Sequence, residues 1–247
     1  MSVSDSFETQ LRDAKLSALA EFAAGAGHEI NNPVATIIGY AQQLLAKEAD
    51  PERRQALLTI GAQAYRIRDM IGDAMLFARP PEPRPTHEDL AQAAREVIET
   101  LRADLPRSIL WEIQADKPVT VWADAVQLRI VISSLLRNSV EALSASTAGR
   151  IGVEVDAQEI DARAWGRLRI TDNGRGLSEL EREHLFDPFF SGRQAGRGLG
   201  FGLPKCWRIV TLHGGRIEVT SLSGETTATV IWPSTDDQGP LAIKRRI

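Results

Sequence analysis

The chain has 247 residues, of which 43% are hydrophobic and 25% are charged, and its formal net charge is -4 at pH 7. These values are ordinary for a globular protein with one large domain or two modest ones. The slight acidic excess excludes a chain-wide basic field that would hold nucleic acid or an anionic membrane, so phosphate recognition must be local. Cys206 is the only cysteine, which excludes an internal disulfide and a multi-thiolate metal site. We expect a reducing compartment, the cytoplasm.

The most apolar early stretch, residues 16–26, contains Glu21 and is shorter than the roughly 20 residues of a membrane-spanning helix. It also lacks the basic start and the cleavage pattern of a signal peptide. We therefore expect no membrane contact from this chain itself. A sensor region that precedes it in a longer native protein stays an open alternative.

Apolar residues recur at three- and four-residue steps from Phe7 to Lys47, which predicts a long amphipathic helix. A turn follows, with Asp50 as the N-cap and Pro51 at the first position of a second helix. That helix has its own apolar stripe, from Leu57 to Phe77. The two stripes are too wide to cover each other, which favours a dimeric four-helix bundle over a monomeric hairpin covered by the rest of the chain.

Four prolines within residues 80–85 end the second helix, because proline cannot propagate it. Beyond them, helices alternate with a mostly antiparallel sheet, which predicts an α+β fold with a two-layer sandwich. The predicted parts are a helical hairpin (1–79), a proline-rich linker (80–86), a second domain (87–235) and a loose tail (236–247).

In the second domain, two helices are expected at about Leu90–Leu105 and Leu203–Leu212. A third is expected to begin after Asp124, which acts as its N-cap together with Gln127. The expected strands are Leu110–Ala115, Val119–Trp122, Ile151–Val155, Leu168–Thr171, Arg216–Thr220 and Thr227–Trp232.

His28 stands within the first helical pattern, next to Glu29. A neutral imidazole nitrogen can attack phosphorus, and the adjacent carboxylate can accept the proton of the other ring nitrogen or orient the ring. By itself this pair more often marks a solvated helix face.

Asn138 lies among the apolar residues of the helix that follows Asp124. Its amide oxygen suits Mg²⁺, which keeps waters and substrate phosphates in most other positions, although a hydrogen-bonded core asparagine fits equally. Asp172 ends an alternating strand and precedes Asn173-Gly174-Arg175-Gly176. A carboxylate there can accept from a base amino group while the glycines let a flat ring approach, and a simple turn is the alternative.

Five glycines lie within residues 192–202, together with Arg193 and Arg197, just ahead of the helix expected at Leu203. Such a loop can cradle an anion, and the arginines can reach a polyphosphate, whereas the alternative is a flexible solvated loop. The spacing matches neither the nucleoside-triphosphate phosphate loop nor the dinucleotide fingerprint.

Taken in order, these segments resemble the sequence boxes of sensor histidine kinases of two-component systems, in the group with a short nucleotide lid such as nitrogen-regulation kinases. The resemblance runs from about Leu16 to Pro233. The matching segments are His28–Pro33 (H box), Leu135–Ala142 (N box), Asp172–Gly176 (first glycine box), Phe186–Phe190 (F box) and Gly198–Leu203 (second glycine box).

The resemblance implies a dimerisation and phosphotransfer hairpin followed by an ATP-binding domain of the GHKL (Bergerat) type. It implies that His28 is the phosphoacceptor, Glu29 its general base and Asn32 the residue that positions water for dephosphorylating a partner. It also implies Asn138 as the Mg²⁺ ligand and Asp172 as the adenine reader. The other implied nucleotide-binding residues are Gly174, Gly176, Arg193, Arg197, Gly198, Gly200, Gly202 and Thr226.

The implied activity is that of an ATP-dependent protein histidine kinase, with ATP and Mg²⁺ as cofactors. It phosphorylates itself on His28 and passes the phosphoryl group to an aspartate of a response regulator receiver domain, with phosphatase action on that regulator as a second activity. The implied assembly is a homodimer. The alternatives are a GHKL-type ATPase and a non-catalytic dimeric signalling scaffold. Ser134, Glu225 and Ala228 depart from the family's usual Asn, Gly and Phe, and none of these changes removes a principal chemical group.

Overall fold

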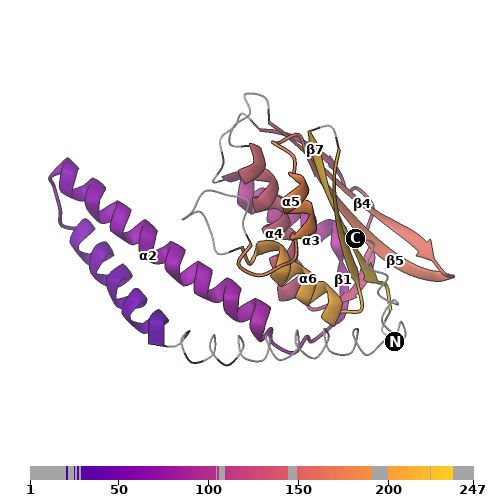
Figure 1. Cartoon of the computed structure of the whole chain (residues 1–247), viewed down its shortest axis with the longest axis horizontal. Coiled ribbons are helices and arrows are strands. Elements are labelled where there is room, and N and C mark those ends of the chain that lie inside the picture. Colours follow the sequence, from indigo (N-terminus) through magenta and orange to yellow (C-terminus); the bar gives the residue numbers. More distant parts are fainter. Residues whose placement is uncertain are drawn as a thin grey trace. The chain divides into compact units, whose positions relative to one another are not determined.

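The computed structural model describes residues 21, 25, 27, 29–103, 105, 109–143, 149–190, 200–222 and 224–235 (Figure 1). It divides into two compact units, Met1–Pro81 and Glu82–Ile247. The first unit contains a helical hairpin and the second contains helices on a sheet, so the predicted α+β class is confirmed. The tail predicted over 236–247 lies outside the described residues.

In the first unit, residues 29–45 form one helix and α2 (Pro51–Ala78) forms the other. The predicted turn is confirmed, because Asp50 caps α2 by accepting a hydrogen bond from the Arg53 amide at 2.9 Å, and Pro51 is the first helical residue. The two helices run antiparallel, with Gln42 Nε2 donating to the Tyr65 hydroxyl at 2.7 Å.

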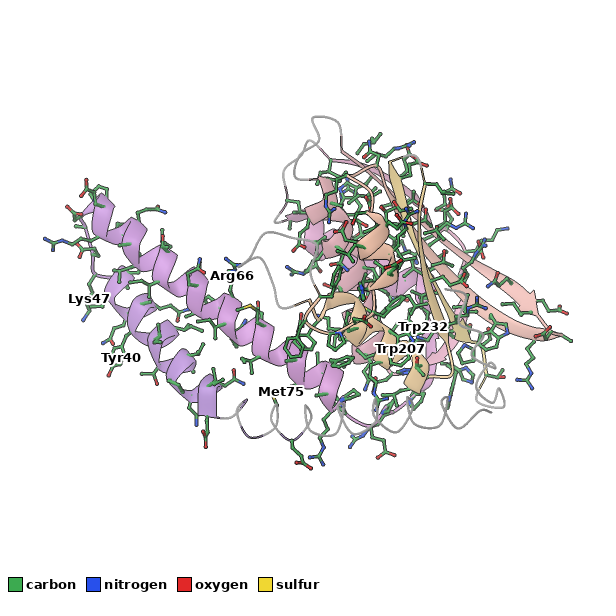
Figure 2. The ribbon with its side chains drawn as sticks, viewed as in Figure 1. Tyr40, Lys47, Arg66, Met75, Trp207 and Trp232 are labelled. Atoms are coloured by element: carbon green, nitrogen blue, oxygen red, sulfur yellow. The ribbon has the colours of Figure 1, made fainter. Side chains whose placement is uncertain are left out.

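Several apolar side chains of this hairpin remain exposed in the single chain (Figure 2). Those of the first helix lie three and four residues apart and so share one face, whereas on α2 only Ile60 and Ile67 share a face. The exposed set is Ile37, Tyr40, Leu44, Leu58, Ile60 and Ile67.

The second unit contains a five-stranded sheet in the order β2-β4-β5-β7-β6, in which only the β2–β4 pair is parallel. A separate antiparallel pair joins β1 to β3. The helices lie on one face of the large sheet (Figure 1). The strands are β1 (Thr86–Asp89), β2 (Leu110–Gln114), β3 (Thr120–Ala123), β4 (Arg150–Ile160), β5 (Arg163–Asp172), β6 (Arg216–Leu222) and β7 (Glu225–Pro233). The helices are α3 (Leu90–Ala103), α4 (Ala125–Ala142), α5 (Glu179–Glu183) and α6 (Gly202–Leu212).

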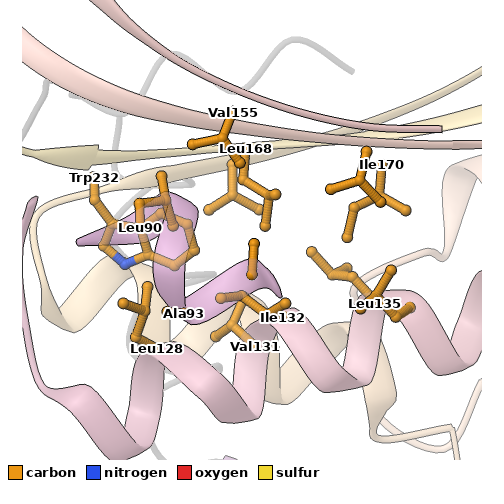
Figure 3. Packing of buried hydrophobic residues seen from close by; sticks show 14 of the residues in the cluster. Leu90, Ala93, Leu128, Val131, Ile132, Leu135, Val155, Leu168, Ile170 and Trp232 are labelled. Carbon is orange, nitrogen blue, oxygen red and sulfur yellow. The ribbon is translucent and has the colours of Figure 1, made fainter. Parts of the chain in front are cut away.

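The core of the second unit lies between α4 and the sheet (Figure 3). Leu128, Ile132 and Leu135 of α4 face Leu168 and Ile170 of β5, and all of these residues are at most 2% exposed. Each such side chain contributes about 1.5–3 kcal/mol through burial. This packing fixes the end of β5 against α4, where the predicted site residues lie.

Two elements escaped the sequence prediction, and four strands are longer than expected: β4 and β5 by six residues each, β6 by two and β7 by three. Strand β1 is short and polar, and α5 has only five residues, so neither shows a hydrophobic period. Strands β4 and β5 extend to a tight turn at Asp161 and Ala162, which both have positive φ. The parts of β4 and β5 next to this turn pair through backbone hydrogen bonds, but their residues do not alternate between apolar and polar. The sequence pattern therefore did not predict them.

Asp124 connects three parts of the second unit. One carboxylate oxygen caps α4, while Oδ2 accepts from the Arg84 amide of the proline-rich segment at 3.0 Å. The Asp124 amide in turn donates to His213 Nε2 at 3.0 Å, and His213 Nδ1 donates to the Ile209 carbonyl at 2.9 Å. His213 is only 8% exposed, so its neutral ring joins the end of α6 to the start of α4.

We expect stability to depend on pH through this ring. Burial lowers the pKa of His213. Its contribution to the stability of the fold is therefore complete above its pKa in the unfolded state, about 6.5, and is lost as pH falls through its lower pKa in the folded state. Thermal unfolding of wild type and His213→Gln between pH 8 and 5 checks this. On acidification, the free energy of unfolding of wild type should fall by about 1 kcal/mol more than that of the variant, which is the scale of one hydrogen bond. Parallel curves for the two proteins would contradict the expectation.

Candidate nucleotide-binding site

Asp172 is the last residue of β5 and is 4% exposed. Its Oδ1 accepts a hydrogen bond from the Gly174 amide at 3.0 Å, and the side chain of Ser139 on α4 also bonds to the carboxylate. Burial raises the pKa of Asp172, while the hydrogen bonds from Gly174 and Ser139 oppose that rise. A buried carboxylate with spare acceptor capacity is suited to a donor such as a base amino group.

The loop after Asp172 is held on two sides. Gly174 lies so close to α4 that a Cβ there would meet Ala142 Cβ at 2.7 Å. Gly176 has φ +72° and faces Ser221 Oγ. Ser221 Oγ accepts from the Leu177 amide at 3.1 Å and lies 3.3 Å from Thr226 Oγ1. Thr226, which pairs with Asp172 across the sheet, therefore supports the loop through Ser221.

Gly174→Ala should weaken nucleotide binding at least tenfold, because the added methyl pushes the loop away from α4 and displaces its bond to Asp172. Calorimetric titration with ADP measures the effect. Gly152→Ala is the matched control, since the nearest atoms to a Cβ at that position are at 3.9 Å. Equal ADP affinity in the two variants would contradict the expected steric effect.

Asn138 lies on α4 opposite the start of α6. An ideal Cβ on Gly202, the first residue of α6, would stand 3.3 Å from Asn138 Oδ1. Gly200 has φ +73° and packs against the Phe190 backbone, where a Cβ would collide with the carbonyl oxygen. Gly202 thus permits close approach to the amide of Asn138, and Gly200 permits close approach to the backbone of Phe190.

The structure brings together Asp172 with Gly174 and Asn138 with Gly202, and it links Gly176 to Thr226 through Ser221. The predicted residues His28, Arg193, Arg197 and Gly198 lie outside the described residues. Glu29 and Asn32 belong to the first helix of the other unit, where both are exposed. The sequence prediction missed two hydroxyl residues, Ser139 and Ser221; the position of Ser139 directly after Asn138 was the available signal for the first.

Two protein-family models match the chain. Residues 18–83 match the His Kinase A (phospho-acceptor) domain, and residues 123–236 match the histidine kinase-, DNA gyrase B- and HSP90-like ATPase. The first match covers the hairpin and the second covers α4, α6 and the large sheet apart from β2.

Among curated proteins, the signal transduction histidine-protein kinase AtoS of Escherichia coli K12 is 31% identical over 92% of this chain and 37% of AtoS. The sensory histidine kinase/phosphatase NtrB of Vibrio alginolyticus is 30% identical over 85% of this chain and 61% of NtrB. The chain therefore spans less than two thirds of either relative. Full-length ShkA in complex with AMPPNP has a similar fold, with a TM-score of 0.70 at 24% identity over 90% of this chain and 47% of ShkA.

The fold and the arrangement around Asp172 define a helical hairpin joined to an ATP-binding domain of the GHKL type. The chain belongs to the sensor histidine kinases of two-component systems. Within the part of the chain that the structure describes, no helix combines the length and the apolar character needed to span a bilayer.

Proposed function

We propose that this chain is an ATP-dependent protein histidine kinase that phosphorylates itself on His28 and passes the phosphoryl group to an aspartate of a response regulator. The observation that carries the proposal is the buried carboxylate of Asp172, bonded to Gly174 and held against α4 beside Asn138. This site follows, in the same chain, a segment that matches a phospho-acceptor domain.

In this proposal the adenine amino group donates to Asp172, and the flat ring lies along the loop of Gly174 and Gly176. The polyphosphate extends toward the start of α6, beside Gly200 and Gly202. Arg193, Arg197 and Gly198 complete its binding. A solved relative of the same fold, ShkA, holds the ATP analogue AMPPNP.

Magnesium would be held by the Asn138 amide oxygen together with phosphate oxygens of the nucleotide and water. The residues fit such an ion, because Asn138 offers a hard oxygen ligand at the place where Gly202 leaves space. The bound ion supplies charge neutralisation of the phosphate oxygens.

Transfer requires the γ-phosphate to come in line with His28. A bond forms between a ring nitrogen and the γ-phosphorus while the bond to the bridging oxygen breaks, and ADP leaves. Glu29 accepts or directs the proton of the other ring nitrogen. Phosphohistidine then donates to the regulator, and Asn32 positions water for the reverse hydrolysis; NtrB is described as a kinase and phosphatase.

The proposed assembly is a homodimer, in which the exposed apolar residues of the hairpin pack against those of a second copy. A receiver domain is the proposed second partner, as in the solved complex of ThkA with the response regulator TrrA, which has a TM-score of 0.62 at 22% identity over 94% of this chain and 67% of that one. The proposed compartment is the cytoplasm, where ATP is available.

Incubation of the full chain with γ-labelled ATP and Mg²⁺ tests the proposal. Wild type should acquire label that is lost in acid and survives alkali, and His28→Gln should acquire none. If His28→Gln still hydrolyses ATP and wild type acquires no label, the result would instead favour a GHKL-type ATPase. Absence of nucleotide binding in wild type would favour a non-catalytic scaffold.

A further inference from the structure

Arg175 and Glu181 form an ion pair beside the loop that follows Asp172, and no step proposed above uses it. Arg175 Nη1 donates to Glu181 Oε2 at 2.9 Å and Nη2 donates to Oε1, so the guanidinium and the carboxylate meet in the bidentate geometry. The side chain of Glu181 is 9% exposed. The hydrogen bonds from Arg175 lower the pKa of Glu181 to about 2, which keeps the pair ionised at neutral pH.

Each partner of the ion pair is anchored to a different helix. The Arg175 amide donates to the Ala142 carbonyl at the end of α4, at 3.3 Å. Glu181 Oε2 accepts from the Ser178 amide at 2.9 Å, and Ser178 Oγ accepts from the Glu181 amide at 3.2 Å, which completes a capping box at the start of α5. The ion pair therefore ties the loop to the start of α5.

The loop tolerates only small displacements from its position. Gly174 already touches α4, and Gly176 occupies a left-handed conformation that faces Ser221. Arg175 stands between the two glycines, so its side chain controls the backbone along which a flat ring would lie. Its own guanidinium is committed to Glu181.

We propose that Arg175 is a positioning residue for the adenine base, because its ion pair with Glu181 holds Gly174 and Gly176 at the distance from Asp172 that the base requires. The proposal rests on the proposed function and deepens its nucleotide site. Arg175 acts through the loop and makes no contact with the nucleotide.

The test compares full-length wild type, Arg175→Gln, Glu181→Gln and the double variant by calorimetric titration with ADP and with GDP, together with the Tm of each protein. Each single variant should bind ADP about tenfold more weakly and lose preference for ADP over GDP. The double variant should bind no more weakly than either single variant, because the two residues act as a unit. Glutamine can still fill the capping box at position 181, so α5 should persist.

The matched control is Arg167→Gln, which removes the ion pair with Asp156 on the opposite face of the same sheet and should leave ADP binding unchanged. Should both glutamine variants unfold, Arg175→Lys decides, because lysine keeps the Glu181 carboxylate compensated without the bidentate geometry. It should show a smaller loss of the same preference.

Folded variants that bind ADP as wild type does would overturn the proposal. An equal loss for ADP and GDP that follows the fall in Tm would overturn it too, since that result describes a purely structural ion pair. Failure of wild type to bind either nucleotide would overturn the proposed function itself, and this inference with it. The wild-type titration therefore separates the two failures.

Discussion

Asp172→Asn should weaken ADP and ATP binding roughly 100-fold while leaving the fold intact, because a hydrogen bond to a charged acceptor contributes about 1.5–3 kcal/mol. The asparagine keeps an oxygen that can accept from the Gly174 amide, and the Ser139 hydroxyl can reverse its role as donor. In contrast, the amino group of a bound adenine would meet a neutral amide in place of the charged carboxylate. Calorimetric titration of both nucleotides gives the affinities, and autophosphorylation at saturating ATP gives the effect on transfer.

Asp156→Asn is the matched control for this experiment, because Asp156 is also a strand carboxylate of the second unit but pairs with Arg167 on the other face of the sheet. It should bind ADP as wild type does. The two variants should have similar Tm values to wild type within a few degrees. Retention of ADP affinity by Asp172→Asn would remove the carboxylate from the proposed base recognition.

Asn138→Ala should abolish the gain that magnesium gives to nucleotide binding and should reduce autophosphorylation at least 100-fold, since a bound metal ion contributes several kcal/mol at a transferring phosphoryl group. Each protein provides its own control when ADP is titrated once with Mg²⁺ and once with EDTA. Wild type and variant should differ with Mg²⁺ and agree in EDTA.

Asn138→Asp sharpens the same experiment. Aspartate keeps an oxygen ligand for the ion, so it should retain part of the magnesium-dependent gain, whereas alanine retains none. Equal magnesium dependence in wild type, Asn138→Ala and Asn138→Asp would exclude Asn138 as a ligand and would leave it as a helix residue that packs against Gly202.

The elements with strong local signals were predictable from the sequence. Asp50 and Pro51 act within a single turn, so their capping role follows from residue order alone. The periodic stripes of the hairpin and of α4 likewise predicted their helices. Strand β1 and helix α5 were not found, because β1 exists through pairing with β3 and α5 is a single capped turn. The pattern Ser178-Glu179-Leu180-Glu181 was the available signal for α5.

The residues of the candidate site likewise include some that the sequence identified and some that it could not identify. Asn138 and Asp172 were identified because each stands at a conspicuous place in a regular pattern. Ser221 could not be found, since it supports the loop through the amide of Leu177, a residue 44 positions away in the sequence. The Arg175 and Glu181 pair was also out of reach, because it depends on how the loop folds back onto α5.

The bond between the Arg84 amide and Asp124 limits the freedom of the segment between the two units. Strand β1 starts at Thr86, and α2 ends at Ala78, so only residues 79–83 provide slack, roughly 15–20 Å when fully extended. Five residues therefore separate the end of α2 from the point where the chain is bonded to the N-cap of α4, the helix that carries Asn138.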